Sequence, residues 1–164
     1  MVGEVTLSSG ANADYYVDAR RALLRPAGFL AAGELIAAAA GELGAETVGG
    51  PVMAAIPLAC AAIAVPAGSN LRAFFVRKER KDHGLQRWIE GPVEAGDRCL
   101  VVEDTVTTGG STVAAIERIR EEGLEIVGAV CVVDRLAGGA DAIAAAAQAP
   151  VRALTTIDDL YPDR

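Results

Sequence analysis

Two apolar runs in the second half of the sequence constrain the fold more than any other feature. Residues 98–103 and 126–133 are rich in valine and other aliphatic residues, without clean alternation of apolar and polar side chains. Strands buried on both faces have this pattern, as in parallel sheets covered by helices. Residues 112–122, between the runs, have helical spacing, and Gly123 supplies a C-terminal stop. The segment is therefore predicted to form a strand–helix–strand unit with parallel strands.

The alternation of strand and helix continues outside this unit. We expect helices at residues 26–43, 53–65 and 140–148, and strands at residues 48–50 and 71–76. Residues 1–20 differ, because two short apolar segments flank a polar turn, as in a hairpin that lies over the sheet. The composition is 52% hydrophobic but only 4% aromatic, which suits helices packed closely on a valine-rich sheet. The prediction for residues 1–164 is one domain of the α/β class, with a mostly parallel sheet flanked by helices.

Composition and charge exclude several classes of protein. The net charge of −7 argues against a dedicated DNA- or RNA-binding protein, which needs a cationic surface. No apolar run reaches the roughly 18 residues needed to cross a bilayer, and the first ten residues lack the positive charge of a signal peptide. Cys60, Cys99 and Cys131 lie far apart among aliphatic residues, so we expect small buried side chains rather than disulfides or metal ligands. We therefore expect a soluble cytoplasmic protein that binds neither membrane nor nucleic acid.

The most informative segment joins the first apolar run to the helix that follows it. The strand is expected to end in two acids, Glu103 and Asp104, and a loop of small and hydroxyl-bearing residues follows at 105–112. Ligands of open α/β sheets bind at the carboxyl ends of the strands, and such a loop before a helix suits a monophosphate. The carboxylates suit sugar hydroxyls or Mg²⁺. The P-loop and dinucleotide motifs are both absent, which leaves a plain turn with capping hydroxyls as the structural alternative.

A second segment gathers positive charge in an otherwise acidic chain. Residues 77–84 read Arg-Lys-Glu-Arg-Lys-Asp-His-Gly and include the chain's only histidine. A mobile cationic loop suits a polyanionic leaving group, because negative charge develops on that group as the bond breaks. The alternative for such a run is a solvated charged hairpin. The negative balance elsewhere in the chain favours the functional interpretation.

Both segments resemble the type I phosphoribosyltransferases, whose substrate is phosphoribosyl pyrophosphate (PRPP). The acidic pair followed by Thr-x-Thr-Thr-Gly-Gly-Ser looks like the PRPP signature, and Arg-Lys-x-x-Lys-x-His-Gly resembles the catalytic loop of the orotate enzymes in particular. The resemblance implies that Glu103 and Asp104 hold the ribose hydroxyls of PRPP. The loop around its 5′-phosphate would comprise Thr105, Val106, Thr107, Thr108, Gly109, Gly110, Ser111 and Thr112. The pyrophosphate contacts would be Arg77, Lys78, Lys81 and His83.

Features outside these two segments also resemble the orotate enzymes. The N-terminal segment is similar to the family's hairpin, whose aromatic pair stacks on orotate, so Tyr15 and Tyr16 would contact the base. Packing on the sheet is the structural alternative for both tyrosines. Arg135 matches the arginine that binds the carboxylate of orotate, and its planar guanidinium suits that group. Thr107 matches a loop threonine that contacts the base.

The resemblance implies a reaction, a metal and an assembly. The reaction would be transfer of ribose 5-phosphate from PRPP to orotate, a step of pyrimidine biosynthesis that gives orotidine 5′-monophosphate and pyrophosphate. Mg²⁺ would arrive with PRPP, because no cluster of side chains suggests a closed metal cage. The chain would form a homodimer in which the flexible loop at residues 77–91 reaches the neighbouring subunit's site. The alternatives are a purine-salvage phosphoribosyltransferase and a non-catalytic, PRPP-sensing regulator that binds RNA, which the net charge disfavours.

The sequence also departs from the family's pattern. Ser8 and Ala54 stand where lysines are common, the latter a lysine that contacts PRPP, and Glu103 stands where aspartate is frequent. We expect no helix ahead of the hairpin, although the family usually has one. These differences are expected to affect PRPP affinity more than the identity of the base.

Overall fold

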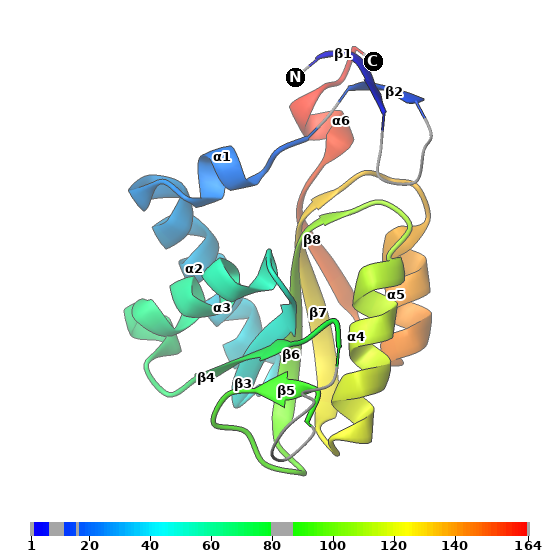
Figure 1. Ribbon diagram of the computed structural model, residues 1–164. Coiled ribbons are helices and arrows are strands. Elements are labelled where there is room, and N and C mark those ends of the chain that lie inside the picture. Colours follow the sequence, from blue (N-terminus) through cyan, green and yellow to red (C-terminus); the bar gives the residue numbers. More distant parts are fainter. Residues whose placement is uncertain (1, 7–11, 16, 80–86, 164) are drawn as a thin grey trace.

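The computed structural model describes residues 2–6, 12–15, 17–79 and 87–163 (Figure 1). Within these residues, one sheet has the strand order β5-β4-β3-β6-β7-β8. The strands are β3 (Thr47–Pro51), β4 (Arg72–Val76), β5 (Ile89–Glu90), β6 (Arg98–Val106), β7 (Glu125–Asp134) and β8 (Val151–Thr156). The neighbouring strands are parallel, except that the short edge strand β5 pairs antiparallel with β4. The predicted fold class, an α/β domain with a mostly parallel sheet, is confirmed.

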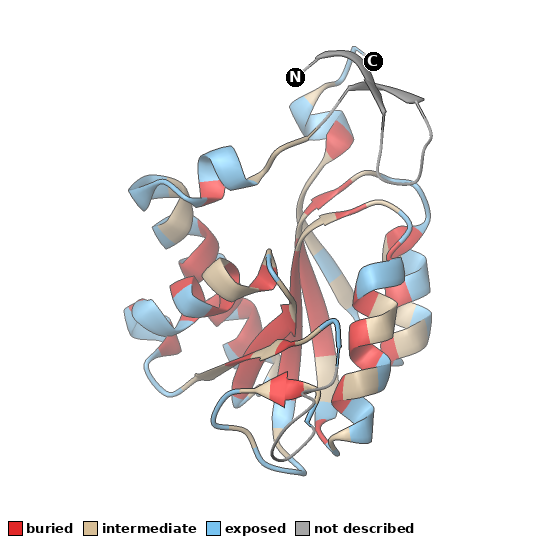
Figure 2. Cartoon of the chain, viewed as in Figure 1, coloured by how far each residue is buried: buried red, intermediate tan, exposed pale blue. Residues whose placement is uncertain are grey.

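Helices cover both faces of this sheet. Helices α2 (Pro26–Leu43) and α3 (Ala55–Ala64) lie on one face, whereas α4 (Gly110–Glu121) and α5 (Gly139–Ala147) lie on the other (Figure 1). The central strand β6 contributes to the core on each side, because Leu100 and Val102 pack in the cluster of α2 and α3 while Val101 packs in that of α4. Figure 2 shows this buried layer between the helices. Burial on both faces explains why the apolar run of β6 lacks alternation.

The shorter elements lie mostly around the end of the sheet where β6 and β7 finish. They are the hairpin strands β1 (Val2–Thr6) and β2 (Asn12–Tyr15), the helices α1 (Arg20–Leu23) and α6 (Ile157–Leu160), and a 3-10 turn, η1 (Pro66–Gly68). Strands β1 and β2 pair antiparallel in a separate sheet, so the predicted hairpin is confirmed. Figure 1 places it near α6, above the carboxyl ends of the central strands. The hairpin therefore lies over the end of the sheet where a ligand is expected.

Two sequence-based expectations are wrong in detail. Strand β6 does not end at the acidic pair but continues to Val106, because Thr105 and Val106 still pair with β7. Glu103 and Asp104 are thus residues of the strand itself. Cys60 is exposed on α3, whereas Cys99 and Cys131 are buried as expected. The expectation for Cys60 fails because its position faces outward on a surface helix.

The other predicted elements appear within a few residues of their expected bounds. The helix expected at 26–43 has those bounds, since a proline opens it and Gly44, in a left-handed conformation with φ of 65°, ends it. Helix α4 starts two residues earlier than expected, at Gly110. Strands β5 and β8 were not predicted. No helix in the described part of the chain is both long enough and apolar enough to cross a membrane.

Candidate active site

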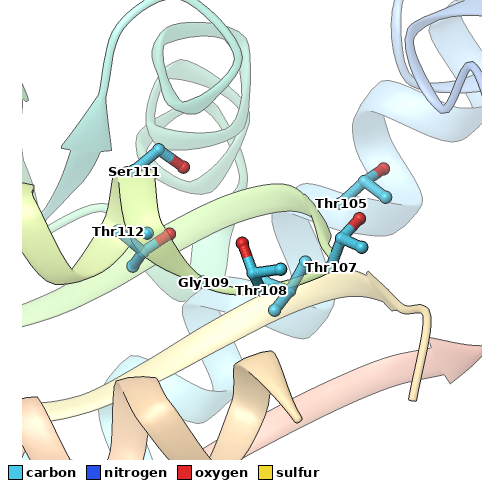
Figure 3. Close-up of a pocket in the computed structure, with 8 residues that line it drawn as sticks. Thr105, Thr107, Thr108, Gly109, Ser111 and Thr112 are labelled. Carbon is cyan, nitrogen blue, oxygen red and sulfur yellow. The ribbon is translucent and has the colours of Figure 1, made fainter. Parts of the chain in front are cut away.

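The predicted phosphate loop surrounds a small cavity at the carboxyl end of β6. A cavity of about 150 Å³ is lined by residues 105–112, and Figure 3 shows their side chains along the turn from β6 into α4. A single water molecule needs roughly 10–15 Å³ of such space, so the cavity has room for a phosphate group. The lining consists of hydroxyl-bearing side chains, glycines and one valine. Because no cationic side chain among the described residues lines the cavity, an anion here would be bound by backbone N–H groups and hydroxyls.

The start of α4 provides those N–H groups. Gly109 precedes the helix with φ of 76°, and no side chain caps the first turn. The N–H groups of a helix's first turn have no partner within the helix, and the helix dipole places positive charge there. No acidic residue lies in this first turn. The arrangement is that of a helix N-terminal site for a phosphate.

The loop rests on the start of α5, a contact that the sequence analysis missed. A Cβ atom on Gly109 would lie 2.7 Å from the carbonyl oxygen of Gly139, and one on Gly139 would lie 2.4 Å from that of Thr107. Both distances are shorter than real Cβ contacts allow, so glycine is required at each position. The Gly-Gly pair just ahead of the expected helix at 140–148 was the only sequence signal. Gly139 thus belongs to the support of the phosphate loop.

Glu103 faces the first turn of α4. Its Oε2 accepts hydrogen bonds from Thr112 Oγ1 at 3.0 Å and Ser111 Oγ at 3.2 Å, and its Oε1 accepts one from the N–H of Asp104 at 3.3 Å. The side chain is buried, with 7% of the residue exposed. Burial raises the pKa of Glu103 to about 7, with a smaller contribution from the charge of Asp104, and the hydroxyl and N–H donors only partly offset this. Glu103 thus holds two hydroxyls of the phosphate loop, those of Ser111 and Thr112.

Asp104 has more open surroundings than its neighbour. It is partly exposed, and its Oδ1 accepts a hydrogen bond from the N–H of Thr105 at 2.7 Å. Burial raises the pKa of Asp104, while that N–H and the charge of Arg20 counteract the shift. Arg20 itself pairs with Asp18 at 2.9 Å. Neither Asp18 nor Arg20 was expected at the site from the sequence, although the charged Asp-Ala-Arg-Arg stretch just after the hairpin was a signal for them.

Two of the predicted base contacts lie together at the ends of β6 and β7. Arg135 directly follows β7, and its backbone N–H donates to the carbonyl oxygen of Val106 at 2.9 Å. Its Nη1 donates to Thr107 Oγ1 at 3.4 Å. The guanidinium therefore lies beside the phosphate loop, on the side of β7. Of the predicted aromatic pair, Tyr15 belongs to β2, and Tyr16 lies outside the described residues.

Of the cationic loop expected at residues 77–91, the structure describes the two ends, residues 77–79 and 87–91. Arg77 directly follows β4, and its Nη1 lies 3.3 Å from Glu90 Oε1 on β5. Lys78 is exposed. Lys81 and His83 lie outside the described residues. Among the residues that are described, no group of three or more His, Cys, Asp or Glu side chains gathers as in a protein metal cage.

Comparisons with known proteins agree with this geometry. The sequence model of the phosphoribosyl transferase domain family matches residues 23–147 of this chain. The orotate phosphoribosyltransferase of Corynebacterium glutamicum (strain R) is 49% identical over 158 residues, which are 96% of this chain and 85% of the relative. The crystal structure of the Mycobacterium tuberculosis H37Rv orotate phosphoribosyltransferase with Fe(III) dicitrate matches with a TM-score of 0.86 at 44% identity, covering 98% of this chain and 90% of that one.

A second structure of the Mycobacterium tuberculosis enzyme contains PRPP. It matches with a TM-score of 0.81 at 40% identity, over 95% of this chain and 88% of that one. Family, relatives and structures therefore agree with one another and with the phosphate loop described above. The chain belongs to the phosphoribosyl transferase family and, within it, to the orotate phosphoribosyltransferases.

Proposed function

We propose that this chain transfers ribose 5-phosphate from PRPP to orotate, releasing orotidine 5′-monophosphate and pyrophosphate. The observation that carries the proposal is a phosphate cavity with a partly exposed carboxylate and an arginine–threonine pair next to its lining. Asp104 directly precedes the residues that line the cavity, and Thr107, one of those residues, accepts a hydrogen bond from Arg135 at the end of β7. A phosphorylated sugar bound between them would bring its reacting carbon between the cavity and the groups that recognise the base. The family of the chain supports the same substrates.

The ribose contacts are proposed to differ between the two acids. Asp104 is partly exposed and can accept hydrogen bonds from the 2′ and 3′ hydroxyls of PRPP. The oxygens of Glu103 already accept bonds from the chain's own donors. Glu103 would therefore act mainly by holding Ser111 and Thr112 in the phosphate loop. These three bonds leave about one acceptor site of the Glu103 carboxylate, on Oε1, for a ribose hydroxyl.

The base and the leaving group are proposed to meet charged groups on opposite sides of the ribose. Arg135 and Thr107 would bind the carboxylate and ring of orotate, with Tyr15 and Tyr16 stacking on it. Arg77, Lys78, Lys81 and His83 would neutralise pyrophosphate. Because the transition state of such a transfer resembles an oxocarbenium ion, the protein would act by positioning the reactants and stabilising charge.

Mg²⁺ is proposed to arrive with PRPP. Two adjacent carboxylates, Glu103 and Asp104, are the acids at the site, and Glu103 is occupied by protein donors. This donor set fits a cation that substrate oxygens coordinate as well, and it is too small for a cage made by the protein alone. When bound, the ion would neutralise charge on pyrophosphate. Asp104 would orient the ribose hydroxyls beside it.

The chain is proposed to act as a homodimer. Among the described residues, most of the exposed large apolar side chains belong to α2, α3 or the segments next to them, namely Leu24, Leu30, Leu35, Met53 and Ile63, whereas Leu136 and Leu160 lie elsewhere. Contiguous exposed apolar patches mark interaction surfaces, so this region is the one we propose for the contact. A second copy of this chain is the partner that the family suggests. A cytoplasmic location, as expected from the sequence, stays a prediction.

The experiment that tests the reaction is a spectrophotometric assay of orotate consumption with PRPP, with and without Mg²⁺. Parallel reactions contain adenine, hypoxanthine or uracil in place of orotate. Turnover of orotate alone, dependent on Mg²⁺, supports the proposal. Turnover of a purine instead would identify a salvage enzyme. A folded protein inactive with every base would favour the regulator, which a salt-dependent RNA-binding assay would then test.

A further inference from the structure

A group of side chains around Trp88 holds the two ends of the cationic loop. Strands β4 and β5 pair antiparallel, with Val76 opposite Ile89. One residue further, the N–H of Arg77 donates to the carbonyl oxygen of Trp88 at 2.9 Å. Arg77 and Trp88 therefore form the last bonded pair of this ladder, and we call this pair the loop neck.

Arg118, from the far half of α4, contacts both sides of the loop neck. Its Nη1 donates to the carbonyl oxygen of Arg77 at 2.8 Å. Its guanidinium carbon lies 4.3 Å from the centre of the Trp88 ring, which is cation–π geometry. One side chain thus binds the strand that leaves the sheet and the strand that returns to it.

Two glutamates of α4 and its C-terminal cap complete the arrangement. The indole Nε1 of Trp88 donates to Glu121 Oε2 at 2.8 Å, and the backbone N–H of Trp88 donates to Glu122 Oε1 at 2.8 Å. The ring, the indole N–H and the backbone of Trp88 are therefore all held by the end of one helix. Bonds of a donor to a carboxylate are among the stronger hydrogen bonds in proteins.

The same helix begins at the phosphate cavity. Helix α4 runs from Gly110, in the cavity wall, to Glu121, at the loop neck. Its 12 residues span about 18 Å at 1.5 Å per residue. An α-helix of this length is a rigid spacer. Helix α4 therefore connects the phosphate cavity to the loop neck, in addition to the sheet, in which β4 is joined through β3 to β6.

We propose that Trp88 and Arg118 are positioning residues for the transfer reaction. They would fix where Arg77 and Lys78 leave the sheet and in which direction, so that these cations start from a defined position when they bind pyrophosphate. In the homodimer proposed above, that pyrophosphate lies in the neighbouring subunit's site. The inference rests on the proposed function, because it needs pyrophosphate as a product. Loosening the loop neck adds conformational freedom that must be lost again when charge develops on the leaving group. The loss should appear in kcat rather than in the KM for orotate.

The test compares Arg118→Gln with Arg120→Gln as a matched control. Arg120 lies on the same helix and also donates to a backbone carbonyl, that of Ala147 at 2.9 Å, on the side of α5. Both variants lose one charge and one such bond, and Arg118→Gln also loses the contact with the Trp88 ring, so its Tm should fall somewhat further. We expect Arg118→Gln to lower kcat at least fivefold with the KM for orotate within twofold of wild type, and Arg120→Gln to keep the wild-type kcat. Equal kcat values in the two variants would overturn the proposal.

A rescue at Trp88 separates positioning from simple loss of packing. Trp88→Phe keeps a ring beneath Arg118 and loses only the bond to Glu121, so it should retain at least half of the wild-type kcat. Trp88→Ala should lose as much as Arg118→Gln. A Trp88→Ala enzyme with wild-type kcat would overturn the proposal as well.

A calorimetric measurement of pyrophosphate binding in the presence of Mg²⁺ tests this inference without depending on which base the enzyme uses. We expect Arg118→Gln to bind pyrophosphate at least threefold more weakly than Arg120→Gln does. Equal affinities, or no binding to the wild type, would refute the positioning role. If the wild type does not consume orotate but the two variants still differ in pyrophosphate affinity, the proposed substrate is refuted and the positioning role is supported.

Discussion

Raising the pH from 5 to 8 is expected to destabilise the folded chain, because Glu103 must then lose its proton inside the protein. The folded pKa of Glu103 is about 7, raised first by burial, whereas the usual value is 4.5. Between these two values the folded chain binds more protons than the unfolded chain, so stability falls as pH rises. The contribution is complete below pH 4.5 and is lost as pH rises through 7.

The magnitude follows from the difference between the two pKa values. At about 1.4 kcal/mol per pH unit, the contribution of Glu103 amounts to at most about 3.5 kcal/mol, of which about 2.5 kcal/mol is lost between pH 5 and pH 8. For a domain of 164 residues, each kcal/mol moves Tm by roughly 2–4 °C. The melting temperature should therefore fall by up to about 10 °C between pH 5 and pH 8 through this group alone.

The assay is thermal unfolding by circular dichroism across this pH range, for the wild type and for Glu103→Gln. The amide keeps the shape of the side chain, and its oxygen can still accept from Thr112, but it does not titrate. Because the variant lacks only this carboxyl, the difference between the two curves reports on Glu103. We expect the variant to lose less stability than the wild type above pH 6. Parallel curves would show that the buried carboxyl does not carry the raised pKa.

Four further substitutions or modifications test other parts of the structure. Gly109→Ala should lower stability by about 1–2 kcal/mol in denaturant unfolding and weaken PRPP binding in calorimetry, because φ is 76° and a Cβ would meet Gly139. Asp104→Asn should raise the KM for PRPP about tenfold while Tm does not fall, and an unchanged KM would remove Asp104 from the ribose site. Lys81→Ala should lower kcat more than tenfold without loss of Tm, and wild-type turnover would remove it from the loop's pyrophosphate contacts. The two buried cysteines, with pKa values raised to about 12, should stay unmodified by a thiol reagent at pH 8 until urea unfolds the chain.

Local patterns predicted much of the architecture because their causes are local. Helix α2 has its expected bounds since proline favours a first turn and Gly44 adopts a conformation that ends a helix. The apolar runs of β6 and β7 predicted a parallel sheet because burial on both faces leaves no polar alternation. Strand β8 gave no such signal, since it is a sheet edge with half-exposed residues.

The candidate site shows the same division. The order of acids, hydroxyls and glycines predicted the phosphate loop, whose residues do line one cavity. The sequence did not predict which way Glu103 points. That direction depends on Ser111 and Thr112, which α4 places against β6 through its packing on the sheet. From their positions in the sequence, Glu103 and Asp104 were therefore expected to play the same role, and only the packing of α4 distinguishes them.

The sequence by itself determined the class of the fold, the phosphate loop and the family, because short-range spacing and residue type suffice for each. The tertiary structure alone decided three features: the extension of β6 to Val106, the packing of the phosphate loop on Gly139, and the hydrogen bonds of Trp88 to Glu121 and Glu122 at the end of α4. Each of these joins segments that lie 28 to 34 residues apart in the chain or pair across strands. Such contacts depend on how the sheet and helices pack together, and a sequence pattern read over one helix or strand contains no information about them.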